Sequence, residues 1–130
     1  MLATDTCSYI IRERPLSVLK KFKKFSTSGI CISVITHAEL LYGVERSSSK
    51  KVNHEVIADF ISRLFIINWD SNSAKKYAEL RAYLEKKGKI IGNMDMMIAA
   101  HALSIGAKIV TNNTRHFRLV PGLKVVNWVK

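Results

Sequence analysis

One stretch of the sequence passes from a β-rich run straight into helical spacing: Ile30-Cys31-Ile32-Ser33-Val34-Ile35-Thr36-His37-Ala38-Glu39-Leu40-Leu41-Tyr42-Gly43. Ser33 stands at the change, and serine favours the N-cap position because its side-chain oxygen accepts a hydrogen bond from the first helical turn. The residues just before it are apolar and mostly β-branched, which favours a strand. We therefore expect a short strand at 30–32 and, directly after it, a helix that carries Glu39.

The same alternation of strand and helix continues on both sides of this stretch. Further strands are expected at 1–4, 65–69, 107–110 and 125–128. Helices are expected from Cys7 after a cap at Thr4, Asp5 or Thr6, and over 15–25, 52–65, 71–86 (capped by Ser71 or Ser73) and 93–104 (capped by Asn93). Short strands that alternate with helices are typical of an α/β fold with a parallel sheet. With 130 residues and no evident linker or repeat, the chain is expected to form one domain, residues 1–130.

The chain is strongly basic. It has 21 Lys and Arg residues against 10 Asp and Glu residues, which gives a net charge of +11. Hydrophobic residues make up 48% of the chain, a proportion typical of a folded protein, so the excess charge must lie on its surface. Such a surface attracts polyanions, and RNA, DNA, an acidic protein and an anionic membrane surface all remain candidates at this stage.

The sequence predicts a cytoplasmic protein that does not enter a membrane. The stretch 96–107 has no charged residue, but it is shorter than the roughly 18 apolar residues needed to span a bilayer. The N-terminus lacks the basic region and apolar core that are typical of a signal peptide. Cys7 and Cys31 do not have the spacing of metal ligands, and we expect both to be reduced thiols.

Several acidic residues, such as Glu55, Asp59 and Glu79, have a basic neighbour at helical spacing, but Glu39 and Asp95 do not. Both lie among apolar residues, with no Lys or Arg three or four positions away. An isolated carboxylate in such a setting is unfavourable unless a bound cation or a catalytic role accounts for it. Glu45 also lacks such a neighbour, yet it lies in a polar stretch where water solvates it. The lack of a basic residue at helical spacing alone therefore does not identify an acid as a site residue.

Four polar side chains are expected near the carboxyl ends of the strands, where parallel sheets bind ligands: Asp5, Glu39, Asp95 and Asn113. Oxygen ligands of this kind favour Mg²⁺ or Mn²⁺, and an acidic site within a basic surface suits metal-assisted cleavage of a phosphodiester chain. Nucleic-acid binding without a metal is disfavoured, because bare carboxylates repel phosphates. Simpler interpretations remain open, since Asp95 can favour a helix N-terminus and Asn113 can cap a helical turn.

Four segments of the chain resemble those of the VapC toxins, which are PIN-domain endoribonucleases of bacterial toxin–antitoxin pairs. The segments are MLATDTCSYI (1–10), SVITHAELLYG (33–43), IGNMDMMIAAHA (91–102) and VTNNTRHF (110–117). Each alone is moderately specific. Together, in this order and spacing, they cover nearly the whole chain and form a strong signature.

The resemblance implies a PIN-like (Rossmann-like) α/β domain, with a short, mostly parallel central sheet flanked by helices. It implies an endoribonuclease that depends on Mg²⁺ or Mn²⁺ and cleaves structured RNA, plausibly transfer RNA in its anticodon loop. Glu39 and Asp95 match acids of the family, and Asn113 stands where many relatives carry Asp. The family also implies a VapB-type antitoxin that covers the site, and a homodimer.

Two further groups of residues are expected to support the site. Three can hydrogen-bond to its acids, although helix capping is an equal alternative for them: Thr4, Thr111 and Asn112. Four arginines lie close to it in sequence: Arg12, Arg14, Arg115 and Arg118. Because arginine binds phosphates and carboxylates well, we expect these four to contact RNA or the antitoxin.

The chain departs from the family at one position. The first strand of the family normally ends in Leu-Asp-Thr-Asn or Leu-Asp-Thr-Asp, whose leading Asp is a metal ligand, and Ala3 stands in its place. Three explanations compete: a substitution introduced to silence a toxic enzyme, which we prefer, a naturally degenerate member, or Asp5 acting as the replacement ligand. We expect this chain to cleave RNA poorly or not at all. The rival interpretation is a catalytically dead protein that binds RNA or the antitoxin.

Overall fold

One or more helices separate consecutive short strands along the chain in the computed structural model, which describes residues 1–130 apart from the side chain of Thr27. The helices are α1 (Thr4–Ile11), α2 (Leu16–Phe25), the 3-10 helix η1 (Ser26–Ser28), α3 (Val34–Arg46), α4 (Lys50–Ile61), α5 (Ser71–Lys86), α6 (Asn93–Ile105) and α7 (Thr114–Phe117). The strands are β1 (Cys31–Ser33), β2 (Phe65–Ile67), β3 (Ile109–Val110) and β4 (Val125–Val126). Within the described residues, no helix is both long and apolar enough to cross a bilayer.

Residues 1–3 join two parallel strand pairs into one sheet. β1 pairs with β2 and β3 pairs with β4, both in parallel. Between the pairs, the Leu2 amide donates to the carbonyl of Cys31 and the Ala3 amide to the carbonyl of Val110, each at 2.9 Å. Leu2 also forms a parallel bridge with Val110. The order is therefore β2, β1, residues 1–3, β3, β4, and the predicted α/β fold with a parallel sheet is confirmed.

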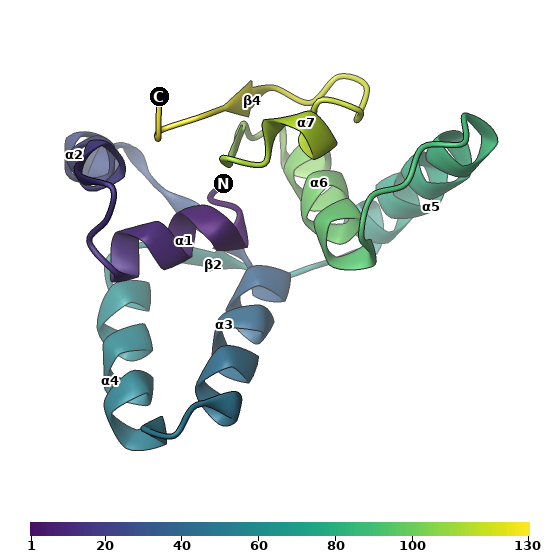
Figure 1. The fold of residues 1–130 in the computed structure, drawn as a ribbon. Helices are drawn as coiled ribbons and strands as arrows, with labels where there is room; N and C mark the ends of the chain where they lie inside the picture. Colours follow the sequence, from purple (N-terminus) through teal and green to yellow (C-terminus); the bar gives the residue numbers. More distant parts are fainter.

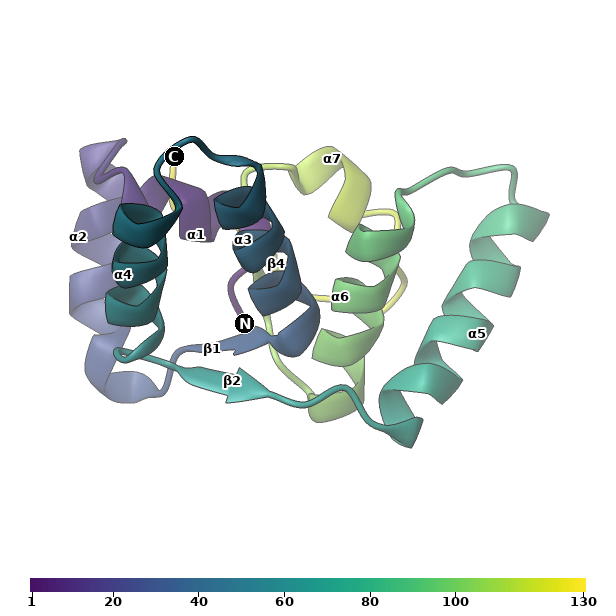
Figure 2. The ribbon, with the colours of Figure 1, turned by 90° about the horizontal axis from the view of Figure 1, so that it is seen from below.

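The side chains of residues 1–3 point alternately into two apolar cores, as expected for an extended segment. Leu2 packs with Phe22, Ile32 and Phe60 from α2, β1 and α4. Met1 and Ala3 belong to the second core, which is formed mainly by α5, α6, α7 and β3. Figures 1 and 2 show these two groups of helices at opposite ends of the molecule, with α3 between them. Cys7 is buried, Cys31 is partly buried, and both are free thiols.

The first helix begins earlier than the sequence suggested. Its N-cap is Ala3, whose carbonyl accepts a hydrogen bond from the Cys7 amide at 3.2 Å. The expected start at Cys7 is wrong, and so is a cap at 4–6, because those residues form the first helical turn. The helix starts as soon as the sheet ends, which places Thr4 and Asp5 directly at the edge of the sheet.

The N-caps predicted from the sequence are correct for α3 and wrong for α5 and α6. Ser33 caps α3 as predicted, since its hydroxyl oxygen accepts from the Ile35 amide at 3.1 Å. The cap of α5 is Asp70, which accepts from the Ser73 amide at 3.0 Å, so the expected serine caps are wrong. A carboxylate is the stronger acceptor at a helix N-terminus. The cap of α6 is Gly92 rather than the expected Asn93, which lies inside the helix.

A chain of hydrogen-bonded polar groups fixes α6 between α3 and α5. The ring of His101 lies with Nδ1 2.7 Å from Ser33 Oγ, and Ser104 Oγ donates to the His101 carbonyl at 2.8 Å. Ser104 Oγ is in turn 3.1 Å from Ser73 Oγ, which donates to Asp70 Oδ1. The N-caps of α3 and α5 are thus linked through α6. Since α6 carries Asp95 and α3 carries Glu39, this linkage sets where the two acids stand.

We predict that His101→Asn makes the protein less sensitive to acid. Burial lowers the pKa of His101 below its ordinary value, so the folded state disfavours the protonated ring. The unfolded state then binds more protons, and stability falls as the pH drops below about 6.5, by at most about 1.4 kcal/mol per pH unit. Asn can keep the contact with Ser33 but cannot take up the proton. Thermal unfolding at pH 7.5 and 5.5 measures the difference.

The matched control is His54→Asn, because His54 is exposed at the surface of α4. The fall in Tm between the two pH values should be smaller for His101→Asn than for the parent and unchanged for the control. An equal fall in all three proteins would mean that His101 does not contribute to the acid sensitivity.

Candidate active site

The carboxyl-terminal edge of the sheet gathers the acids that the sequence singled out. Thr4 and Asp5 form the first turn of α1, directly after residues 1–3. Glu39 lies in α3, which follows β1, and Asp95 lies in the first turn of α6. Asn113 comes between β3 and α7. The carboxylates of Glu39 and Asp5 both act electrostatically on Asp95, so these three acids lie near one another.

Thr4 joins the first turn of α1 to α3. Its hydroxyl donates to Glu39 Oε1 at 2.5 Å and lies 3.4 Å from the hydroxyl of Thr36. Glu39 is partly buried, and a hydrogen bond to a carboxylate is stronger than one between neutral groups. Thr4 therefore holds the Glu39 side chain beside the end of the central strand.

Asp5 ties α1 to the loop after β3. Its Oδ1 accepts from the Thr6 amide at 2.8 Å, and its Oδ2 accepts from the Asn112 amide at 2.9 Å. The Thr111 hydroxyl lies within 3.1 and 3.2 Å of the two oxygens, and it also accepts from the Asn113 amide at 2.9 Å. Both carboxylate oxygens thus hold protein donors. These contacts support a positioning role for Asp5, and a role as metal ligand stays a prediction.

Asp95 carries the electrostatic signature of the site. Burial raises its pKa, and the neighbouring carboxylates of Glu39 and Asp5 raise it further. His116 lowers the pKa, which places this histidine beside the acids. The negative charge of the site is therefore only partly compensated within the chain, as expected where a cation binds.

His116 is the residue that sequence reasoning missed. It is partly buried in α7, with Nδ1 2.9 Å from Nδ2 of Asn113. Its position three residues after Asn113 was the available clue, because side chains at this spacing meet on a helical turn. Asn113 is the N-cap residue of α7, as the capping alternative expected, but its side chain makes no capping hydrogen bond.

The donors fit Mg²⁺ or Mn²⁺ in kind but not in number. Glu39 and Asp95 offer the carboxylate oxygens that these ions prefer. Among the residues that the structure describes, however, no group of three or more His, Cys, Asp and Glu side chains is placed to hold a metal ion. Ala3 is buried at the end of the central strand and contributes only a methyl group there. The site therefore lacks a donor where the strand ends.

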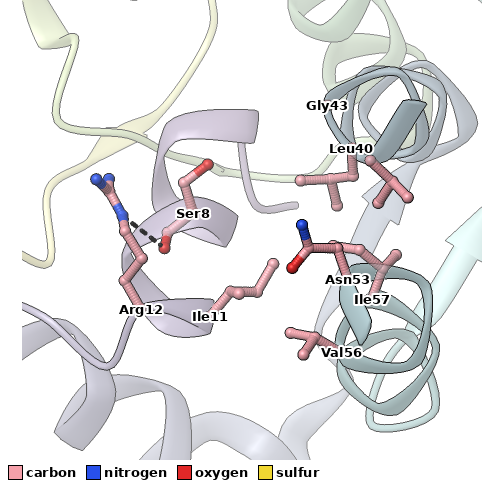
Figure 3. A pocket seen from close by; sticks show the side chains of 9 residues that line it. Ser8, Ile11, Arg12, Leu40, Gly43, Asn53, Val56 and Ile57 are labelled. Carbon is pink, nitrogen blue, oxygen red and sulfur yellow. Dashed lines mark hydrogen bonds between the residues drawn. The ribbon is translucent and has the colours of Figure 1, made fainter. Parts of the chain in front are cut away.

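The four candidate arginines are all exposed around this edge: Arg12, Arg14, Arg115 and Arg118. Arg12 lines a pocket of about 360 Å³ between α1, α3 and α4, shown in Figure 3 together with Leu40 and Asn53. Its Nε donates to the Ser8 carbonyl at 3.3 Å, and its guanidinium lies 5.6 Å from the centre of the Tyr9 ring. Arg115 lies in α7 and Arg118 is the C-cap residue of this helix, so both are close in sequence to Asn113 and His116.

Comparison with known proteins identifies this arrangement. The family model described as the PIN domain matches residues 2–123. Ribonuclease VapC2 of Haemophilus influenzae is 43% identical over 129 residues, which cover 99% of this chain and 97% of that protein. The chain belongs to the PIN-domain family, among the VapC ribonucleases. The resemblance drawn from the four sequence segments is confirmed.

Further relatives match this PIN domain over its full length. The tRNA(fMet)-specific endonuclease VapC of Salmonella typhimurium is 41% identical over 98% of this chain and 96% of that protein. The crystal structure of VapBC2 from Rickettsia felis, bound to a DNA fragment from its promoter, superimposes with a TM-score of 0.94 at 42% identity. That match covers 98% of this chain and 97% of the other. The DNA-bound VapBC of Salmonella typhimurium gives a TM-score of 0.93 at 41% identity, covering 98% and 96%.

We predict that Asp95→Asn raises the Tm of the metal-free PIN domain at pH 7. The folded state raises the pKa of Asp95, so the ionised carboxylate is less favourable there than in the unfolded chain. Asparagine removes this charge. The gain should shrink as the pH falls toward the ordinary carboxyl pKa of about 3.9, where the parent also becomes neutral. Glu55→Gln, at an exposed position of α4, should give no such gain.

Asp5→Ala should destabilise the metal-free protein by about 2–3 kcal/mol in urea unfolding, because it leaves the donors of Thr6, Thr111 and Asn112 without their charged acceptor. Asp5→Asn keeps one acceptor oxygen and should lose less. If Asp5 served only to bind a metal, neither substitution would lower the stability of the metal-free protein.

Proposed function

We propose that this chain is the toxin of a type II toxin–antitoxin module, built to cleave structured RNA with the help of Mg²⁺ or Mn²⁺. The observation that carries the proposal is the convergence of Glu39 and Asp95 at the strand ends, where burial and the Glu39 carboxylate raise the pKa of Asp95. Transfer RNA is the substrate class we favour, since the Salmonella typhimurium relative is named as a tRNA(fMet)-specific endonuclease.

Glu39 and Asp95 would hold the metal ion. A divalent ion at such a site lowers the pKa of a bound water and stabilises negative charge on a phosphoryl group. The chain itself supplies the arrangement: Thr4 orients Glu39, and Asp5 holds the loop that presents Asn113. Thr111 and Asn112 act through Asp5 rather than directly on the metal.

Ala3 impairs this site. The position lies at the N-cap of α1, where an Asp side chain would be favoured by the helix N-terminus and could also face the metal. Asp5 is the weaker candidate for the missing ligand, because its oxygens already accept hydrogen bonds from the backbone and from Thr111. The chain as it stands therefore binds metal weakly and turns over slowly or not at all.

The partner we propose is a VapB-type antitoxin, as in the superimposable VapBC assemblies. Arg12 beside its pocket and the arginines of α7 offer guanidinium groups to RNA phosphates or to antitoxin carboxylates. We also propose a homodimer. Ile90 is 87% exposed and Met94 49% exposed next to Asp95, and a second copy would cover them.

The rival function is that of a binding protein without catalysis, and Ala3 is the observation in its favour. Such a protein would bind RNA or the antitoxin without cleaving RNA. It differs from the first proposal in one respect that can be tested, which is whether an acid at position 3 restores cleavage.

Ala3→Asp should restore Mn²⁺-dependent cleavage of total transfer RNA. We expect discrete fragments and a rate at least roughly 100-fold above that of the parent, equal to about 2.7 kcal/mol of activation free energy. Adding Glu39→Gln to Ala3→Asp should abolish cutting. Mn²⁺ should also raise the Tm of the Ala3→Asp protein more than that of the parent, because ligand binding stabilises the folded state.

Each other outcome has its own meaning. Discrete cutting by the parent would show that Asp5 or water completes the site. If the Ala3→Asp protein binds Mn²⁺ more tightly than the parent but cuts no RNA, the rival function of a binding protein is favoured. If it shows neither tighter Mn²⁺ binding nor RNA cleavage, position 3 does not belong to the metal site.

A further inference from the structure

Nearly all the net charge of the chain comes from two segments that contain no acid. Residues 14–38 hold five Lys and Arg residues and no Asp or Glu, and residues 96–130 hold another five and no acid. The rest of the chain is almost neutral, because its basic residues alternate with the ten acids. The ten basic residues of the two segments are Arg14, Lys20, Lys21, Lys23, Lys24, Lys108, Arg115, Arg118, Lys124 and Lys130, and all are exposed. We call them the basic surface.

The two segments are far apart in sequence but lie side by side in the fold. Phe25 of α2 stacks on Trp128, with ring centres 5.9 Å apart, and the Ser17 hydroxyl donates to the Val129 carbonyl at 3.1 Å. Lys21 and Lys108 line one pocket between them, of about 440 Å³. Figure 1 shows α2, the C-terminus, β4 and α7 following one another along one side of the molecule.

The C-terminal residues connect this surface to the candidate active site. Asn127 Nδ2 donates to Asn112 Oδ1 at 3.1 Å, and Asn112 belongs to the loop that Asp5 holds. One and two residues later, Trp128 and Val129 contact α2. The basic surface therefore extends from the arginines of α7, beside Asn113, to the lysines of α2.

The charges on this surface are free to meet a partner. Every ion pair found among the described residues lies within residues 45–85, and none involves the basic surface. Lys21 and Lys24 lie 6.0 and 5.3 Å from the centre of the Phe25 ring, which holds their ammonium groups near the C-terminal residues. A cluster of like charges without internal partners costs stability, and a polyanion would relieve this cost.

We propose that the basic surface is a second RNA-binding site, which holds the sugar–phosphate backbone of a structured RNA away from the point of cleavage. This inference rests on the proposed function, because it takes RNA as the substrate. The α7 end would bind phosphates next to the acids, and the α2 end would bind a remote part of the same RNA. Structured RNA, which can reach both ends at once, would bind more tightly than a short single strand.

An acidic polypeptide is a weaker match for this surface. Protein interfaces usually have an apolar centre with large side chains. Within the described part of the chain, the large apolar side chains that are exposed lie mostly in residues 42–94, and the basic surface is flanked only by Leu16 and Ile105. Phe22 and Trp128 are buried. Charge without exposed apolar anchors is typical of contacts with a phosphate backbone.

The test is an equilibrium binding experiment with total transfer RNA at several salt concentrations. The chain as it stands suits the experiment, because under the proposed function Ala3 leaves cleavage slow or absent during the titration. The variant is Lys20→Gln/Lys24→Gln, which removes two exposed charges one turn apart on α2. The matched control is Lys75→Gln/Lys76→Gln, which removes the same charge from α5, where acids are interspersed. Circular dichroism verifies that each variant is folded.

We expect the α2 variant to bind roughly tenfold more weakly near 0.1 M salt, with the slope of log K against log salt reduced by about 1–2. The control should change affinity less than about twofold. In the Ala3→Asp protein, the α2 variant should raise KM and leave kcat unchanged, since only remote binding is lost.

Three results would overturn the proposal. If the α2 variant binds transfer RNA as tightly as the parent, the second site does not exist, and the nuclease assignment is unaffected. If the variant and the control lose the same affinity, the loss is explained by net charge alone and not by the position of the lysines. If poly-L-glutamate binding weakens in the α2 variant but transfer RNA binding does not, the surface binds acidic protein. Failure of every version to bind transfer RNA would contradict both this inference and the proposed function.

Discussion

The structure depends on the backbone hydrogen bonds of residues 1–3. Without them the sheet would consist of two separate strand pairs, because Leu2 and Ala3 donate to opposite sides, to Cys31 and Val110. The protonated amino terminus adds a hydrogen bond to the Lys108 carbonyl at 2.8 Å. Since α1 begins directly after this segment, the same bonds that close the sheet place Thr4 and Asp5 between α3 and the loop after β3. Fold and site therefore form together.

The candidate active site carries negative charge, whereas the basic surface carries positive charge. The acids of the site are partly buried close to one another, which costs stability in the absence of a cation, whereas the basic surface costs stability through repulsion between its exposed charges. Each cost would be relieved by a different part of one complex, a metal ion in the first case and an RNA backbone in the second. The unbound chain is destabilised by both kinds of repulsion, and a complex with metal and RNA would remove both.

Much of the fold can be predicted from local sequence. Most of the features that cannot be predicted in this way are set by contacts between distant residues. Ser33 is a good cap in any context, and the isolation of Glu39 and Asp95 among apolar residues is visible without a structure. The early start of α1 is not visible, because it results from the end of the sheet rather than from helix propensity. Besides the adjacent Thr6 amide, the carboxylate of Asp5 bonds to residues more than a hundred positions away, and its sequence neighbours say nothing about these distant partners. His116 was missed because its effect on Asp95 depends on the fold.

Ala3 shows how this fold separates its structural and chemical requirements. The amide of residue 3 closes the sheet and its carbonyl starts α1, and any residue other than proline could make both hydrogen bonds. The side chain is needed by neither, which is why an alanine fits there with the helix and sheet intact. A carboxylate at this position, as the proposed function requires, would meet Glu39 and Asp95 across a site that already lacks compensating charge. Alanine therefore avoids a source of repulsion in the metal-free protein and, under the proposed function, deprives the metal of a ligand, so that a well-formed domain and a disabled site would both follow from the same residue.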